Sequence, residues 1–84
     1  MALTDYEKYI RTEELLALQK APSALTCHDE LQFQIVHQAH ELYMKLVEHE
    51  LVFTCKLLAA NELARATTHL KRVATTQRVL MASI

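Results

Sequence analysis

The sequence predicts an all-α chain, and its composition and helix signals carry the prediction. Its 84 residues include one proline and no glycine, although typical usage would give about six glycines in this length. A parallel-sheet nucleotide fold needs a glycine-rich phosphate loop, so the composition excludes that class. Apolar periodicity and capping residues divide the chain into a short N-terminal helical segment followed by two long antiparallel helices.

The N-terminal helical segment covers residues 4–19. Thr4 and Glu7 stand in the spacing of a capping box, in which each side chain bonds the backbone N–H of the other residue. Thr12 is a candidate cap for a second short turn. Residues 20–28 contain the only proline and are typical of a linker.

The second helix begins at Thr26 or Asp29 and extends to about Ala60. At 100° per residue, one stripe of apolar side chains forms the expected core face: Ile35, Ala39, Leu42, Leu46, Phe53 and Leu57. The opposite face mixes aromatic, imidazole, thioether and charged groups: Phe33, His37, His40, Glu41, Met44, Glu48 and Cys55.

Asn61 is the expected cap of a third helix that runs from Glu62 to Ile84. The expected packing stripe of this helix has Leu63, Leu70 and Ile84 at one heptad position and Thr67, Ala74 and Met81 at the position beside it. Val73 and Leu80 widen the stripe. No stop signal follows the last apolar residue. A second helix of about 45 Å would also exceed the roughly 30 Å diameter of a compact chain of this length. We therefore expect residues 1–84 to be the N-terminal portion of a larger helical bundle, or one protomer of an intertwined oligomer.

Charge and hydropathy argue against nucleic-acid and membrane partners. Nine basic and ten acidic residues give a net charge of −1, which provides no basic footprint for nucleic acid or an anionic membrane. The longest apolar runs have four residues, as in Leu57–Ala60, whereas a membrane span needs about 20. Cys27 and Cys55 form no metal or redox motif, so free thiols in a cytoplasmic protein are expected.

The residues alone leave several functions open for the face that carries His37. His37, His40 and Glu41 have a spacing that would let them share a divalent metal, but the Glu-x-x-His pattern of di-iron bundles is missing from the sequence. A helical interaction module without catalysis explains the amphipathic faces equally well. The sequence offers no partner for the three other histidines, which we expect at the surface: His28, His49 and His69.

The order of residues resembles the N-terminal part of the tryptophan 2,3-dioxygenase family from about Tyr6 to Leu80. The densest part reads HDE-x-x-F-x-x-x-HQ-x-x-EL over residues 28–42, and Tyr6-Glu-Lys-Tyr9-Ile10-Arg11 adds a second match. The resemblance implies an all-helical enzyme containing haem b, a homotetramer in the cytoplasm. Such an enzyme inserts both atoms of O₂ into the indole ring of L-tryptophan to give N-formylkynurenine, the first step of the kynurenine pathway.

The same resemblance implies roles for individual residues. His37 matches the distal histidine beside the indole nitrogen, and Phe33 matches the aromatic wall of the substrate pocket. Tyr6, Tyr9 and Ile10 match positions that reach into the active site of a neighbouring subunit. The resemblance implies no metal ligand in this chain, because the proximal histidine of family members lies beyond the matched region.

Two departures from the family pattern keep a related haem enzyme with another aromatic substrate as an alternative. Tyr43 stands where the family usually has tryptophan. Gln32 and Gln34 flank Phe33 in a stretch that the family keeps mostly apolar.

Overall fold

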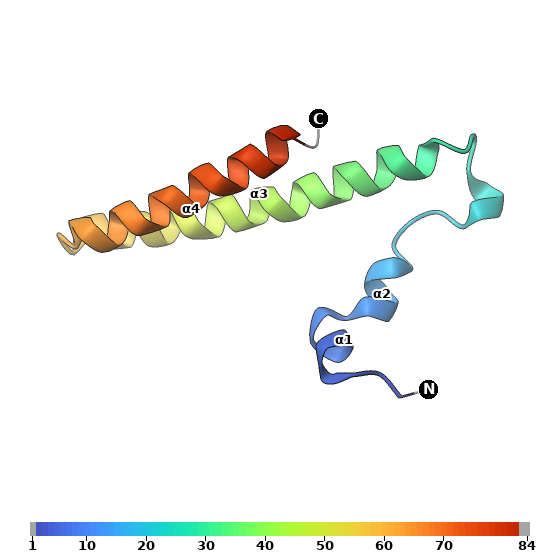
Figure 1. Cartoon of the computed structure of the whole chain (residues 1–84), viewed down its shortest axis with the longest axis horizontal. Helices are drawn as coiled ribbons and strands as arrows, with labels where there is room; N and C mark the ends of the chain where they lie inside the picture. The colour runs from blue at the N-terminus through green and yellow to red at the C-terminus, as the bar shows by residue number, and fades with distance from the viewer. Residues whose placement is uncertain (1, 83–84) are drawn as a thin grey trace. The chain divides into compact units, whose positions relative to one another are not determined.

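The computed structural model describes residues 2–82, and in that range it is all-α, as predicted. The helices are α1 (Asp5–Ile10), α2 (Thr12–Leu16), the 3₁₀ turn η1 (Pro22–Ala24), α3 (Glu30–Ala59) and α4 (Leu63–Ala82) (Figure 1). Ile84, the predicted end of the third helix, lies outside the described residues. The chain divides into two compact units, one up to Ile35 and one from Val36 onward.

In the first unit, the capping box at the start of α1 is present as predicted. The Thr4 hydroxyl accepts the Glu7 N–H at 3.1 Å, and the Glu7 carboxylate accepts the Thr4 N–H at 3.0 Å. Arg11 ends α1 with a left-handed φ of 57°. The prediction that Thr12 caps the second turn is wrong, because Arg11 occupies the cap position and Thr12 is the first helical residue of α2.

The linker is fastened to the first turns of α3 by side chains of that helix. Glu30 accepts a hydrogen bond from the Thr26 N–H at 2.7 Å and one from the Lys20 ammonium group at 3.0 Å. Gln34 accepts the Lys20 N–H at 3.0 Å. Of the two predicted helix starts, Asp29 is the correct one, since it directly precedes Glu30 and its carbonyl accepts an N–H from α3.

The turn between α3 and α4 corrects the expected role of Asn61. The Asn61 N–H donates to the Leu58 carbonyl at 3.0 Å, and the Glu62 N–H donates to the Leu57 carbonyl at 2.8 Å. With Asn61 at a φ of 58°, these bonds form the Schellman arrangement that ends a helix. Asn61 therefore terminates α3 instead of capping α4, and it takes the position that glycine usually fills.

In the second unit, α4 runs back alongside α3 (Figure 1). Four residues are buried at the contact: Thr54, Leu57, Ala66 and Val73. The predicted core stripe of α3 is therefore only partly correct, because Leu57 is buried but Leu42 and Leu46 are exposed. The 20 residues of α4 span about 30 Å against about 45 Å for the 30 residues of α3, so α4 cannot cover the length of α3.

The predicted packing stripe of α4 is also only partly correct. Val73, one of its flanking residues, is buried, and so is Ala66, which was not in the stripe, whereas Leu63 and Leu70, which led it, are exposed. The buried row of Ala66 and Val73 lies about 60° around the helix from the row of Leu63 and Leu70, because residues three apart are separated by about 300°. Within residues 2–82, no helix is both long enough and apolar enough to cross a membrane.

Candidate functional site

Phe33 and His37, the two site residues predicted on the long helix, are both exposed. They are one turn apart in α3, a spacing at which side chains on a helix project side by side. Phe33 is 65% exposed, an unusual state for a phenylalanine. Met44, which shares the predicted face with His37, is also exposed. This edge of α3 therefore presents an aromatic ring, an imidazole and a thioether outward.

His40 is the near neighbour of His37 on the same helix. The two ring centroids are 6.0 Å apart and the ring planes are inclined by 53°. The Nε2 atom of His40 is buried and has no hydrogen-bond partner among the described residues. In that part of the chain, no three histidine, cysteine or acidic side chains come together to hold a metal ion. The metal site considered for His37, His40 and Glu41 is therefore not formed.

The side of α3 opposite His37 is the side that α4 covers. At 100° per residue, Glu50 and Leu57 lie about 140° and 160° around α3 from His37. Leu57 is buried, and Glu50 bonds a side chain of α4. This packing leaves His37 exposed, whereas Met44 and Glu48 of the same predicted face line a groove of about 350 Å³ with Gln77 and Leu80 of α4.

A polar pair joins α3 to α4 at this contact. One Glu50 carboxylate oxygen lies 2.6 Å from Nδ1 of His69, and the other lies 4.0 Å from the Arg72 guanidinium group. The Phe53 ring meets the His69 ring edge to face, with centroids 4.7 Å apart. The hydrogen bond to His69 holds the pKa of Glu50 below its ordinary value of 4.5.

The prediction that His69 is a surface residue is therefore wrong. Its side chain is 15% exposed and is bonded to Glu50 on the other helix. The sequence contains a signal for this location, because His69 lies three residues after Ala66 and four before Val73, the spacing of one helix face. The larger side chains of Leu63 and Leu70 favour a neighbouring face in an analysis based on hydrophobicity.

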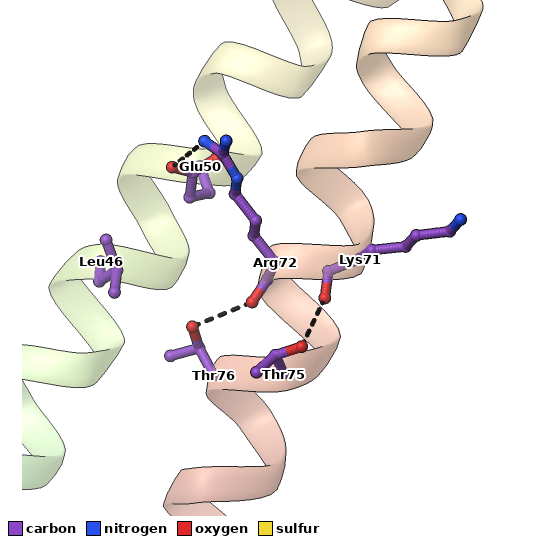
Figure 2. Close-up of a pocket in the computed structure, with 6 residues that line it drawn as sticks. All are labelled: Leu46, Glu50, Lys71, Arg72, Thr75 and Thr76. Carbon is purple, nitrogen blue, oxygen red and sulfur yellow. Dashed lines mark hydrogen bonds and ion pairs between the residues drawn. The ribbon is translucent and has the colours of Figure 1, made fainter.

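An open groove of about 400 Å³ lies beside this pair, between α3 and α4 (Figure 2). Its lining residues are Leu46, Glu50, Lys71, Arg72, Thr75 and Thr76. The Thr75 and Thr76 hydroxyls donate to the backbone carbonyls of Lys71 and Arg72 at 3.1 and 3.0 Å. These hydroxyl groups therefore have no hydrogen left to donate to a ligand in the groove. Figure 2 shows Arg72 turned toward Glu50 and Lys71 turned away from the groove. None of the predicted site residues lines it.

The other three predicted site residues lie on α1, in the first unit. Tyr6, Tyr9 and Ile10 are all exposed, and Tyr9 is 87% exposed. Ile10 also lines a shallow groove of about 280 Å³ with residues of α2 and its flanks: Arg11, Glu14, Leu15 and Leu18. The structure therefore keeps these three together on one short helix, while Phe33 and His37 belong to α3.

Fold and site together define an all-helical chain that carries an aromatic ring and an imidazole on an exposed helix edge, away from its own core. The family model described as tryptophan 2,3-dioxygenase matches residues 1–84. The chain belongs to the tryptophan 2,3-dioxygenase family.

Individual relatives agree with this assignment. The chain is similar to the tryptophan 2,3-dioxygenases of Herpetosiphon aurantiacus, with 41% identity over 83 residues, and of Anaeromyxobacter dehalogenans, with 42% identity over 83 residues. Each match covers 99% of this chain but only 32% and 30% of the relative. A match to the Kineococcus radiotolerans enzyme, at 43% identity, covers 89% of the chain and 26% of the relative. The chain thus spans about a third of the length of the curated relatives it matches. No solved structure matches it significantly.

Proposed function

We propose that this chain supplies the distal side of the haem and substrate site in an enzyme that oxidises L-tryptophan with O₂ to N-formylkynurenine. The observation that carries the proposal is the exposure of both Phe33 and His37, which lie one helical turn apart in α3. Family membership over the whole chain supports the same function.

In this proposal, His37 orients the substrate. A neutral imidazole nitrogen accepts a hydrogen bond from the indole N–H and so fixes the edge of the indole that faces the oxygen. Phe33, one turn earlier, stacks against the flat indole ring, an arrangement that aromatic pairs favour.

The exposed face of α3 is suited to haem b. A haem group is broad, flat and largely apolar, and the exposed Phe33 and Met44 side chains offer apolar contact on the face that also carries His37. Haem, when bound, supplies the iron at which O₂ is activated. This chain's own residues would orient the substrate and exclude water on that side.

Tyr6, Tyr9 and Ile10 are proposed to complete the substrate pocket of a neighbouring subunit in a cytoplasmic homotetramer. Exposed aromatic and branched side chains on one short helix are suited to burial against a partner, because large apolar groups gain free energy when they leave water.

A chimera tests the proposal. The 83 residues of the Herpetosiphon aurantiacus enzyme that match this chain are replaced by this chain, and haem content and tryptophan turnover are measured beside the unaltered enzyme. We expect the chimera to bind haem and to form N-formylkynurenine. A chimera that folds and assembles like the parent but does not oxidise tryptophan would contradict the proposal.

The exposed apolar surface of the second unit favours one other function, a helical oligomerisation module without catalysis. Large side chains on both helices are exposed, among them Leu42, Leu63 and Met81. An inactive chimera, together with defined oligomers of the 84-residue chain in light scattering, would favour that function.

A further inference from the structure

Hydrophobicity alone does not explain which face of α4 packs on α3. Two neighbouring rows of side chains, about 60° apart on the helix, could face α3: one contains Leu63 and Leu70, with Met81 near its end, and the other contains Ala66 and Val73. The first face carries the larger apolar side chains, and burying it would remove more apolar surface from water. The structure buries the second face: Val73 is 6% exposed, whereas Leu70 is 45% exposed.

The buried face differs from the exposed one by its polar residue. His69 lies on the Ala66–Val73 face and reaches Glu50 of α3 at 2.6 Å. Glu50 lies on the face of α3 that also carries the buried Thr54 and Leu57. Both side chains are 15% exposed in this packing, and rotation of α4 would separate them and leave the Glu50 carboxylate on the contact face without its partner.

Charged and aromatic neighbours hold this pair from both helices. On α3, the Phe53 ring packs edge to face against the His69 ring, and His49 directly precedes Glu50 in the chain. On α4, Arg72 lies 4.0 Å from Glu50, and the Arg65 guanidinium lies 6.0 Å from the Phe53 ring centroid. Rotation of α4 would disrupt the contacts that cross between the helices, those of His69 and Arg72 to Glu50 and those of His69 and Arg65 to Phe53.

We propose that the Glu50–His69 pair selects the rotational setting of α4 on α3. Polar residues at the interface of a coiled coil act in the same way: one matched polar pair favours a single arrangement of the helices over arrangements that would bury more apolar surface. The tight turn at Asn61 limits how far α4 can slide along α3. The main remaining freedom of α4 is rotation about its own axis, and the Glu50–His69 pair fixes that rotation. The Leu63–Leu70 face stays outward as a consequence. This inference does not depend on the proposed enzymatic function.

Cysteine accessibility in the full 84-residue chain tests the proposal. In a background with Cys27→Ser and Cys55→Ser, Val73→Cys and Leu70→Cys are introduced separately, and the rate of thiol alkylation is measured. We expect the Leu70→Cys variant to react about tenfold faster or more, because a buried site reacts only when the structure opens. Adding Glu50→His or His69→Glu should abolish or reverse that difference. The control Glu48→Gln, which changes an exposed carboxylate of α3, should preserve it.

The exchanged pair, Glu50→His with His69→Glu, separates pairing from simple loss of folding. The double variant restores an acid and an imidazole across the same contact, so it should recover the slow alkylation of the Val73→Cys variant even where the single changes unfold the helices in circular dichroism. Persistence of the original rate difference in both single variants would overturn the proposal. Failure of the exchanged pair to restore protection at position 73 would also overturn it.

Discussion

Replacing Leu57 with alanine should remove a large part of the stability of the α3–α4 contact. Leu57 is 4% exposed and is one of four buried residues among those described. Full burial of a leucine contributes about 1.5–3 kcal/mol, and the cavity left by truncation raises the typical cost of Leu→Ala to about 2–5 kcal/mol. Because a contact between two helices can relax around a small cavity, we expect the lower part of that range, about 2–3 kcal/mol.

The next residue is a matched control. Leu58 lies in the same helix but is 49% exposed, so Leu58→Ala should cost less than about 1 kcal/mol. Both variants are compared with the unaltered chain in urea unfolding followed by circular dichroism, at two protein concentrations so that self-association is detected. A whole chain of this size is stable by only about 4–12 kcal/mol, so a difference of 2 kcal/mol is easily resolved. Equal costs for the two substitutions would refute the packing described for α3.

Three further predictions concern the turn, the acid range and the substrate. Asn61→Ala should cost about 1 kcal/mol, because a β-carbon without asparagine's local hydrogen bonds disfavours a left-handed residue; an unchanged urea midpoint would contradict the Schellman turn. Hydrogen bonds hold the folded-state pKa values of Glu7, Glu30 and Glu50 below 4.5, so their stabilisation is complete above that pH and is lost as the pH falls through the folded-state values. Helix content in an acid titration should therefore fall below pH 4.5, and less steeply for Glu50→Gln. In the chimera, Phe33→Ala should raise the KM for tryptophan about tenfold without loss of haem, and an unchanged KM would remove Phe33 from the pocket.

Local signals predicted the starts of α1 and α3, whose partners are close in sequence, but not the start of α2, where Arg11 and not Thr12 holds the cap position. The Thr4–Glu7 capping box needs only residues three apart, and the helix start at Asp29 needs only its own turn. Asn61 was located correctly but given the wrong role, because asparagine suits both a helix start and the left-handed residue that ends one.

Packing between helices was harder to predict, because it depends on residues far apart in the chain. The leucines of α4 suggested the wrong face, and only the pairing of His69 with Glu50, 19 residues earlier, distinguishes the two faces. Periodicity did place Leu57 on the packed side of α3 and His37 away from it, since that distinction needs one helix only. The roles of His37, Phe33 and the α1 residues rest on family resemblance and stay predictions.

The most direct test of the proposed function is His37→Ala in the chimera, with His49→Ala as a control on the same helix. If His37 orients or deprotonates the indole, tryptophan turnover should fall about 100-fold, while haem content and assembly stay at the level of the parent. The His49→Ala change should leave turnover within a few-fold. Turnover that is unchanged by His37→Ala, or loss of haem from that variant, would contradict the assignment of His37 to the distal side of the site.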